Sequence, residues 1–440
     1  MDPELSYHFK NRRPSDIRTA QIEFQKRKDE IDAVNVAIGN VSLPMHPLMQ
    51  ERAKNVINEN SPFHKGVVRY TPTAGLDETN KAFLNVIAAS GFDTSSLFSM
   101  ITDGGSAAME LIVLGCCGPA GSEEKPLMVI EPVYTNYISM VKRTGRTTIK
   151  ITRTLQENGK FSLPDFESIE KMMELHNPGA LVVIPYDNPA GHYYNPETMI
   201  KLAQLCVKYN IWMVSDEAYR ELYYIDEKIS SIWGLTNAKV PGIEGRRISI
   251  ETTSKVWNAC GLRIGALVTD NYDFHEKAVF EATANLCPPA IAQYVFGGLA
   301  HESHENLQQW FSKQRNYYKE IGKNLYVGFH EMLPGVIISS PDASIYSVVD
   351  VRNIAKPGFN ATDFVMYCTK KGKIELDNKE YTLLVAPMQG FYKPDEGKEN
   401  PGRTQMRLAY VETPERMKLV PELFARLFLE FEFKRENKQL

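Results

Sequence analysis

The sequence has no long hydrophobic run. Its 440 residues include no apolar stretch of roughly twenty residues, the length that a membrane-spanning helix needs. The first residues, Met1-Asp2-Pro3-Glu4, carry acids and precede a polar, charged stretch, so the apolar core of a signal peptide is also missing. We therefore expect a cytoplasmic protein with no membrane partner.

A strong charge of either sign is absent as well. The chain has 50 Lys and Arg residues against 54 Asp and Glu residues, which gives a formal net charge of −4. This balance argues against a nucleic-acid partner held by bulk electrostatics and against an electrostatic tether to a membrane. The hydrophobic fraction of 43% and the charged fraction of 24% are those of an ordinary soluble globular protein.

Two sequence signals of other protein classes are also missing. The six cysteines show no Cys-x-x-Cys spacing and mostly lie in apolar runs. We expect them to be small buried hydrophobic residues in a reducing compartment, and we expect no metal site. No Gly-x-Gly-x-x-Gly sequence follows the first strand, which weighs against a nucleotide-binding protein built on that fingerprint.

What the sequence does contain is a regular alternation of strands and helices. Apolar strand-like segments begin near Ile149, Leu181, Ile211, Ile248 and Ile264. They alternate with helical stretches, of which residues 165–174 and 196–208 are the clearest. This order predicts an α/β domain whose mostly parallel sheet is covered by helices on both faces.

A chain of this length is expected to form two domains. A long charged amphipathic pattern over residues 305–332 predicts a helix that joins them. Short strands and a final helix from Pro414 then predict a smaller α+β domain. We assign residues 1–60 to an N-terminal arm and part of the small domain, 61–304 to the large domain, and 305–440 to the linking helix and the small domain.

The most informative stretch is residues 251–265, which follow a predicted strand. Hydroxyls at Thr252 and Ser254 flank Lys255, and Arg263 follows between two glycines. A lysine amine can form a Schiff base with an aldehyde, while hydroxyls and a guanidinium can bind a phosphate. The stretch is therefore a candidate binding site for a covalently held, phosphorylated cofactor. A lone lysine after a strand, however, is usually a solvated surface group.

Two neighbouring strands also end in polar side chains. Residues 181–191 read as a buried strand that breaks into a turn at Asn188, and residues 211–219 as a strand that ends at Asp216 and Tyr219. Because the carboxyl ends of parallel strands open onto one edge of a sheet, these side chains are expected to lie near Lys255.

A fourth strand leads into a glycine pair. The predicted strand 98–102 runs into Asp103-Gly104-Gly105-Ser106-Ala107 and then into an apolar helix. Backbone N–H groups and the positive end of the helix dipole make such a start an anion site. Tight packing of the helix on the strand is the other explanation of the two glycines.

Taken together, the motifs resemble those of class I/II aminotransferases, which are fold type I pyridoxal-phosphate enzymes. The resemblance runs from Gly39 to Arg407 and implies a large domain with a mostly parallel seven-stranded sheet, plus a smaller α+β domain. It also implies pyridoxal 5′-phosphate as cofactor, and a homodimer with shared active sites.

The resemblance assigns roles to the residues at the strand ends. Lys255 would be the Schiff-base lysine, and Asp216 the partner of the pyridinium nitrogen. Asn188 and Tyr219 would hydrogen-bond the ring hydroxyl oxygen. Asn188 would also contact the substrate, and Tyr219 would be catalytic together with Lys255 and Asp216. The phosphate would be held by the residues that match the family's cradle, namely Gly105, Ser106, Ala107, Thr252, Ser254 and Arg263.

Four further residues match family positions around the site. Tyr134, in the turn after strand 127–130, would stack on the cofactor ring, although core packing is the common role of such a residue. Tyr70, in Tyr70-Thr71-Pro72-Thr73-Ala74-Gly75-Leu76, would reach the phosphate of the neighbouring subunit. Gly39 and Arg407 would contact the substrate carboxylate, Gly39 through the backbone; a simple turn glycine is the alternative for Gly39.

The implied activity is transfer of an amino group from an L-amino acid to a 2-oxo acid in two half-reactions. Lys255 would serve in turn as the attachment point of the cofactor and as the general acid/base at the substrate Cα. A lyase or decarboxylase on the same fold is the main alternative, since fold alone does not fix the bond that breaks. A regulatory binding protein that keeps the cofactor is a further one.

The substrate side chain is left open by two departures from the family. One dicarboxylate-specific branch has an arginine six residues before a Pro-Pro pair, and here Ala282 stands at that distance from Pro288-Pro289. Another branch has a lysine after the phosphate-loop glycines, where this chain has Ser106. Both departures argue against aspartate specificity by these two routes, and Arg69, Lys65 or a residue of the N-terminal arm are the candidates to replace the missing group.

Overall fold

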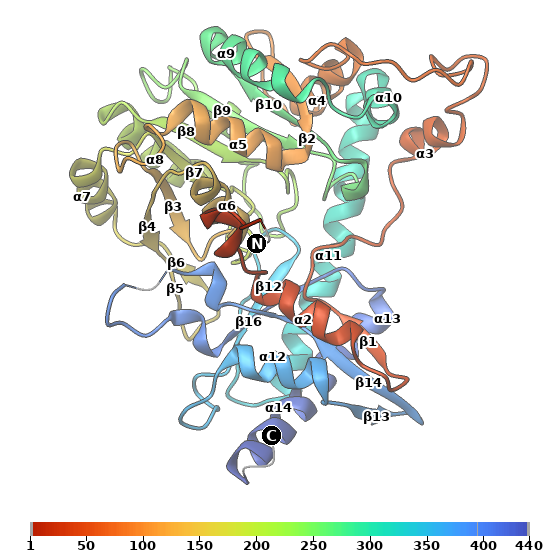
Figure 1. Cartoon of the computed structure of the whole chain (residues 1–440), viewed down its shortest axis with the longest axis vertical. Coiled ribbons are helices and arrows are strands. Elements are labelled where there is room, and N and C mark those ends of the chain that lie inside the picture. Colours follow the sequence, from red (N-terminus) through yellow and green to blue (C-terminus); the bar gives the residue numbers. More distant parts are fainter. Residues whose placement is uncertain (1–2, 394, 438–440) are drawn as a thin grey trace. The chain divides into compact units, whose positions relative to one another are not determined.

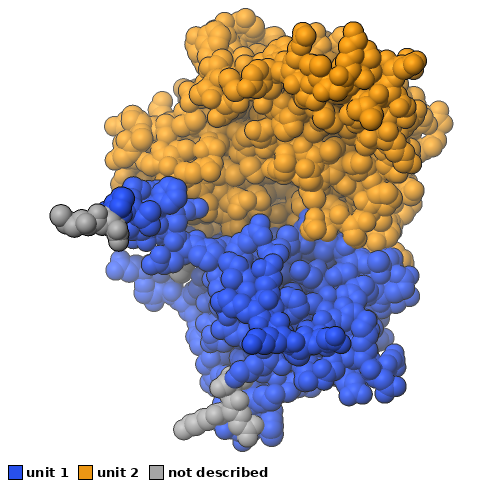
Figure 2. Space-filling model, turned by 45° about the vertical axis from the view of Figure 1, so that its right-hand side comes forward, with its two compact units in different colours: residues 1–39, 323–338, 347–440 blue, residues 40–322, 339–346 orange. Residues whose placement is uncertain are grey.

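The structure, a computed structural model (Figure 1), describes residues 3–393 and 395–437. The chain forms two compact units, shown in different colours in Figure 2. Unit 1 combines Met1–Gly39, Lys323–Ile338 and Ser347–Leu440, and unit 2 combines Asn40–Gly322 and Ser339–Tyr346. The expected domain boundaries after residues 60 and 304 stay predictions, because compactness alone does not define a domain that folds independently.

Unit 2 is built on the predicted α/β sheet. In the described residues the sheet has seven strands, all parallel to their neighbours except β10, which is antiparallel to both strands beside it. The expectation of a mostly parallel seven-stranded sheet is confirmed. In spatial order the strands are β2 (Phe98–Asp103), β10 (Ile264–Thr269), β9 (Arg247–Thr252), β8 (Trp212–Asp216), β7 (Ala180–Val183), β3 (Leu127–Glu131) and β4 (Thr148–Thr152).

Helices follow most of these strands and pack on the sheet. Local sequence explains where they begin: Asp165 and Asn195 accept hydrogen bonds from Ser168 N–H at 2.7 Å and Thr198 N–H at 3.0 Å, as N-cap residues do. The described helices of unit 2 are α3 (Pro47–Lys54), α4 (Asp77–Ala89), α5 (Gly104–Cys116), α6 (Thr135–Arg143), α7 (Phe166–His176), α8 (Pro196–Lys208), α9 (Tyr272–Ala282) and α10 (Ala290–Gly297).

The reversed direction of β10 shapes the edge that carries the predicted site. Since β9 and β10 are antiparallel, residues 253–263 leave β9 and return to the same edge of the sheet. Thr252 pairs with Gly265, and Ile264 pairs with Asp103 at the end of β2. The carboxyl ends of β2 and β9 and the start of β10 therefore meet, next to the ends of β8, β7 and β3.

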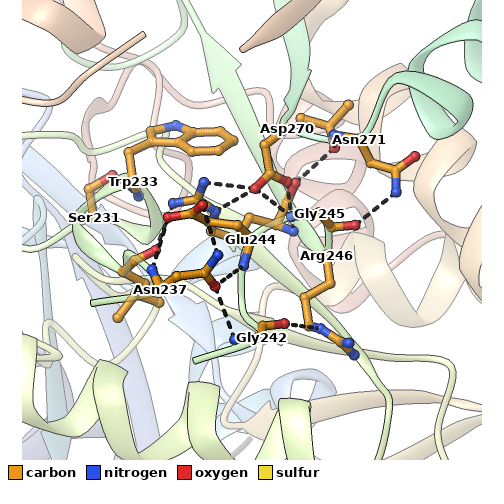
Figure 3. Close-up of polar contacts among 12 residues, drawn as sticks. Ser231, Trp233, Asn237, Gly242, Glu244, Gly245, Arg246, Asp270 and Asn271 are labelled. Atoms are coloured by element: carbon orange, nitrogen blue, oxygen red, sulfur yellow. Dashed lines mark hydrogen bonds and ion pairs between the residues drawn. The ribbon is translucent and has the colours of Figure 1, made fainter. Parts of the chain in front are cut away.

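Polar contacts hold the opposite end of β9 in place (Figure 3). Asp270, just after β10, accepts hydrogen bonds from Gly245 N–H and from Arg247 Nε, each at 2.7 Å. Asn237 donates through its backbone and its side chain to the Glu244 carboxylate, both at 2.9 Å. These contacts tie the loop before β9 to the end of β10, so the strand that leads to Lys255 is anchored at its start.

Unit 1 contains two small sheets in its described residues. In the first, β1 (Asp32–Asn35) runs parallel to β14 (Lys379–Leu384), which pairs with β13 (Ile374–Leu376). The second has the order β11 (Ile337–Ile338), β12 (Tyr346–Asp350), β16 (Gln405–Ala409) and β15 (Ala386–Pro387). This mixture of strands and helices matches the expected α+β organisation.

The helices of unit 1 cover these sheets. Phe364 of α12 meets phenylalanines of α14 edge to face, with 5.4–6.2 Å between ring centroids, and its ring is tilted against Phe359 at 6.2 Å. No helix of the described residues is both long and apolar enough to cross a membrane. The described helices are α1 (Tyr7–Lys10), α2 (Asp16–Gln25), α12 (Ala361–Lys370), α13 (Pro414–Met417) and α14 (Val420–Glu436), and α11 (His304–Met332) runs from unit 2 into unit 1.

Candidate active site

A buried carboxylate lies at the centre of the polar edge of unit 2. Asp216, the last residue of β8, accepts hydrogen bonds from the Tyr137 hydroxyl and from Ala218 N–H, the latter at 3.0 Å. Burial raises the pKa of Asp216 to about 6, although both hydrogen bonds and the nearby Lys255 ammonium lower it. Asp216 is thus a carboxylate poised to take up a cationic partner, because a positive charge beside it would favour its ionised form.

Tyr137 is a site residue that sequence reasoning missed. Its side chain is fully buried, and burial followed by the Asp216 charge raises its pKa well above the usual range. The hydroxyl therefore keeps its proton and donates a hydrogen bond to Asp216. One signal was available: Tyr137 follows Tyr134 by three residues, so the two tyrosines project from the same side at the start of α6.

Asn188 and Tyr219 come together as predicted. Asn188 Nδ2 donates a hydrogen bond of 3.2 Å to the Tyr219 hydroxyl, and both side chains are buried. The Tyr219 hydroxyl also lies 3.0 Å from the hydroxyl of Tyr346, a residue that the sequence did not suggest. An amide and a phenol at adjacent strand ends form a pair of polar groups suited to a ring oxygen.

The connection after β9 brings the predicted phosphate-binding groups together. The Thr252 and Ser254 hydroxyls lie 2.8 Å apart. Arg263 adopts a left-handed backbone conformation with φ of 56° and donates to the Cys260 carbonyl at 3.1 Å. Arg263 Nη2 reaches the Asp103 carbonyl at 3.4 Å, so its guanidinium lies against the start of α5.

The start of α5 fits an anion. A Cβ atom added to Gly104 would lie 2.5 Å from Arg263 Nη2, and one added to Gly105 would lie 2.9 Å from Ile250 Cγ2. Asp103 supplies no side-chain cap, so the first N–H groups of α5, in the turn that holds Ser106 and Ala107, are left to water or a ligand. The set of hydrogen-bond donors here suits a phosphate. It consists of the two hydroxyls, the Arg263 guanidinium and the N–H groups at the start of α5, where only glycine fits.

Two predicted aromatic residues lie in different surroundings. Tyr134 stands directly before α6, and its ring meets the Tyr137 ring edge to face at 5.5 Å between centroids. Tyr70 is 79% exposed on unit 2, in the loop before α4. That exposure leaves its side chain available to a second chain.

The remaining predicted residues belong to unit 1. Arg407, on β16, donates from Nη2 to the Ala37 carbonyl at 2.8 Å and lies over the Phe391 ring at 5.0 Å. Ala409 N–H donates to the Val36 carbonyl at 2.8 Å. These contacts bring β16 and Arg407 beside residues 36 and 37, which lie three and two positions before Gly39 in the same unit.

A buried ionic cluster lies on the other face of the two central strands. Arg220 contacts the Glu251 carboxylate at 2.6 Å and the Glu217 carboxylate at 3.6 Å. Because side chains alternate along a strand, Glu217 and Glu251 point away from the face that carries Asp216 and Thr252. The cluster fixes the ends of β8 and β9 against each other, and it was not predicted from the sequence.

Comparison with solved structures defines the class of fold. The chain matches a mutant of the aspartate aminotransferase of Thermus thermophilus with a TM-score of 0.78, over 97% of this chain and 100% of that chain, at 21% identity. It also matches the alanine aminotransferase of Pyrococcus furiosus with a TM-score of 0.77, over 97% and 100% of the two chains, at 20% identity. The fold is that of the fold type I enzymes, as expected.

Sequence comparison identifies the family. The model of aminotransferase class I and II matches residues 31–404. A relative named aspartate/prephenate aminotransferase, from Thermus thermophilus, is 23% identical over 404 residues, 91% of this chain and 92% of its own. The aspartate aminotransferase of Thermotoga maritima is 24% identical over 365 residues, 82% and 85% of the two chains.

The chain belongs to the class I and II aminotransferases, a family of pyridoxal-phosphate-dependent enzymes. The expectation of an aminotransferase is confirmed, and the lyase or decarboxylase alternative is not favoured.

The raised pKa of Asp216 predicts a measurable effect on stability without cofactor. The unfolded chain ionises this group near its ordinary pKa of 3.8 and the folded chain near 6, so stability falls as pH rises between these values. We expect Asp216→Asn to stabilise the cofactor-free protein at pH 8 by up to about 3 kcal/mol, and by less at pH 5. Urea unfolding at both pH values measures this; a gain that does not grow with pH would contradict the assignment.

Proposed function

We propose that the polar edge of unit 2 binds pyridoxal 5′-phosphate and that the enzyme moves an amino group from an L-amino acid to a 2-oxo acid. The observation that carries the proposal is the buried Asp216 carboxylate, held by Tyr137 and close to Lys255. A buried acid with a raised pKa calls for a cationic partner, and a protonated pyridine nitrogen is one. Its position at the carboxyl ends of parallel strands is where open α/β sheets bind ligands.

Each part of the cofactor has matching groups in unit 2. Thr252, Ser254, Arg263 and the start of α5 at Gly105, Ser106 and Ala107 would hold the phosphate. Asn188 and Tyr219 would bind the ring oxygen, and Tyr134 would cover the ring face. When bound, the cofactor supplies an aldehyde for covalent attachment and a ring that accepts electrons from the substrate Cα.

The protein's own groups then bind, orient and move protons. Asp216, ionised beside the pyridinium, would keep the ring nitrogen protonated. Lys255, once the substrate amine has taken its place, would remove the proton from the substrate Cα and return it to the cofactor carbon. Arg407 and the backbone near Gly39 would hold the substrate α-carboxylate.

The proposed function is tested by recording the visible spectrum of the purified, cofactor-loaded protein while different amino acids are added. We expect an amino acid that is a substrate to bleach the visible band and a 2-oxo acid to restore it. The relatives are named for aspartate and prephenate, but Ala282 and Ser106 stand where two family branches recognise a second carboxylate. Release of pyruvate or ammonia without the bleaching cycle would contradict the proposed function.

Replacement of Arg407 by lysine tests recognition of the α-carboxylate. A guanidinium binds a carboxylate through two parallel hydrogen bonds, whereas an ammonium offers a point charge. We expect Arg407→Lys to raise the KM for amino acids with a loss of about 2 kcal/mol, the scale of a charged hydrogen bond, and to leave cofactor affinity nearly unchanged.

Steady-state kinetics and a cofactor titration of the same variant separate these effects. Arg403→Lys, four residues upstream and ion-paired to Glu399, is a matched control that should keep the parent KM. If the parent enzyme binds decarboxylated amines as tightly as the amino acids, the assigned role of Arg407 is wrong.

We further propose a homodimer in which Tyr70 reaches the phosphate of the opposite subunit. Its 79% exposure supports this, because a tyrosine used only within its own chain would gain by burial. Tyr70→Phe should weaken cofactor binding roughly 10- to 100-fold, which corresponds to one charged hydrogen bond. Cofactor binding and dimer formation should also be linked, since a ligand of the assembled form stabilises it.

Mixing Tyr70→Phe chains with Lys255→Ala chains tests the shared site. In a mixed dimer one site would carry both defects and the other neither, so activity at limiting cofactor should recover. Tyr272→Phe, another exposed tyrosine of unit 2, should behave as the parent. A fully active monomer in sedimentation would contradict this arrangement.

We propose the cytoplasm as the compartment, because all six cysteines are unpaired, as in a reducing environment. We propose amino-acid metabolism and biosynthesis as the role of the enzyme.

A further inference from the structure

Tyr346 connects two parts of the proposed site. It is the first residue of β12, and its side chain is 1% exposed. In the sequence it lies 127 positions from Tyr219. Its hydroxyl is 3.0 Å from the Tyr219 hydroxyl, and the two rings meet edge to face at 5.8 Å between centroids. Nothing in the proposed function gives this second phenol a task.

The backbone before Tyr346 is fastened to both loops that carry the Asn188 and Tyr219 pair. Asp342 and Ala343 N–H groups donate to the Gly191 carbonyl at 2.9 and 3.1 Å, three residues beyond Asn188. Ser344 N–H donates to the Leu222 carbonyl at 2.8 Å, three residues beyond Tyr219. The segment is thus built into the site, and the position of the Tyr346 hydroxyl follows from these contacts.

The close approach of this segment depends on a glycine. Gly191 has a φ of +66°, and a Cβ added to it would lie 2.9 Å from the Tyr346 carbonyl and 2.8 Å from Pro341 Cβ. Only a residue without a side chain allows this approach. Tyr346 is therefore held next to Tyr219 by the fold of the two loops.

The number of hydrogens limits how the two phenols can share their contact, in which either oxygen can be the donor. The Asn188 amide nitrogen can only donate, so the Tyr219 oxygen accepts from it. Tyr219 has one hydroxyl hydrogen. If it were given to Tyr346, none would remain for a ring oxygen; if Tyr346 donates instead, the Tyr219 hydrogen is directed elsewhere.

We propose that Tyr346 is a positioning residue that donates its hydroxyl hydrogen to Tyr219 and thereby keeps the Tyr219 hydrogen for the ring oxygen of the cofactor. This inference rests on the proposed function, because it needs the cofactor at this edge. A phenol that accepts two hydrogen bonds becomes a stronger donor, since neighbouring hydrogen bonds polarise one another. The Tyr346 hydroxyl would therefore strengthen the bond from Tyr219 and favour the ionised ring oxygen.

The pH midpoint of the visible band of the cofactor-loaded protein tests this. We expect Tyr346→Phe to raise that midpoint by roughly half a pH unit, the scale of one neutral hydrogen bond, because the ionised ring oxygen loses support. If Tyr219 donates to Tyr346 in the parent, the same variant frees the Tyr219 hydrogen and the midpoint falls. A downward shift or no shift would overturn the proposal.

Two further variants establish the route and the specificity of the effect. Tyr219→Phe should raise the midpoint more, and adding Tyr346→Phe to it should change nothing further, because the effect passes through Tyr219. The control is Tyr367→Phe, which removes the hydroxyl of a buried tyrosine on α12 that contacts Lys434 in unit 1. An equal shift in Tyr367→Phe, or a full Tyr346→Phe shift without the Tyr219 hydroxyl, would also overturn the proposal.

The same titration distinguishes failure of this inference from failure of the proposed function. A parent protein that binds added pyridoxal 5′-phosphate and shows a visible band supports the function, whichever way the Tyr346→Phe midpoint moves. A parent protein with no such band would overturn both.

Discussion

Lys255→Ala is expected to abolish turnover and leave a folded protein that still binds pyridoxal 5′-phosphate without a covalent bond. The hydroxyls of Thr252 and Ser254 and the Arg263 guanidinium remain in this variant, so the phosphate keeps its partners. The amine that attaches the cofactor and moves the Cα proton is lost. No other assigned residue supplies a base at that position, so the loss should be at the limit of detection.

Single-turnover and steady-state assays with a substrate amino acid measure this loss, and equilibrium dialysis measures retained cofactor. Lys171→Ala is a suitable control, since that lysine is an exposed partner of Glu167 on α7. Transamination by Lys255→Ala at a rate near that of the parent would show that Lys255 is wrongly assigned.

Asp216→Asn is expected to lower turnover by several orders of magnitude and to keep the fold. A neutral amide no longer favours the proton on the ring nitrogen, so the ring becomes a poorer acceptor of electrons. The amide can still accept the hydrogen bond from Tyr137, so the pocket keeps its shape. The variant should therefore lose activity while the cofactor-free protein gains stability above pH 6.

Opposite changes in stability and activity at one residue separate a functional carboxylate from a structural one. Functional sites often keep groups that cost stability, and the raised pKa of Asp216 is such a cost. Asp165→Asn, at the exposed N-cap of α7, should leave both quantities near those of the parent, because asparagine also caps. Unchanged turnover in Asp216→Asn would exclude its assigned role.

Much of unit 2 could be predicted because its signals are local. Strand periodicity, N-caps such as Asp165 and Asn195, and the glycines at the start of α5 each act within a few residues. The rule that parallel strands end at one edge then placed Asn188 and Asp216 together without knowledge of the strand order. The direction of β10, which brings Arg263 beside Gly104, was not contained in any local pattern.

The residues that sequence reasoning missed depend on contacts between distant segments. Tyr137 lies 79 positions from Asp216, and Tyr346 lies 127 positions from Tyr219. The only nearby residue in the sequence that indicates an ion pair for Arg220 is Glu217. The shortest ion pair of Arg220 is with Glu251 on the next strand. A tyrosine or arginine in an apolar stretch is indistinguishable from a core residue until the pairing of strands is known.

Trapping the cofactor on the chain tests the central claim most directly. Purified protein loaded with pyridoxal 5′-phosphate is treated with borohydride, which makes the cofactor–lysine linkage permanent, and the modified peptide is then located by mass spectrometry. We predict a single pyridoxyl group on Lys255. Modification of a different lysine, or of none while the parent enzyme is active, would contradict the account of the site given above.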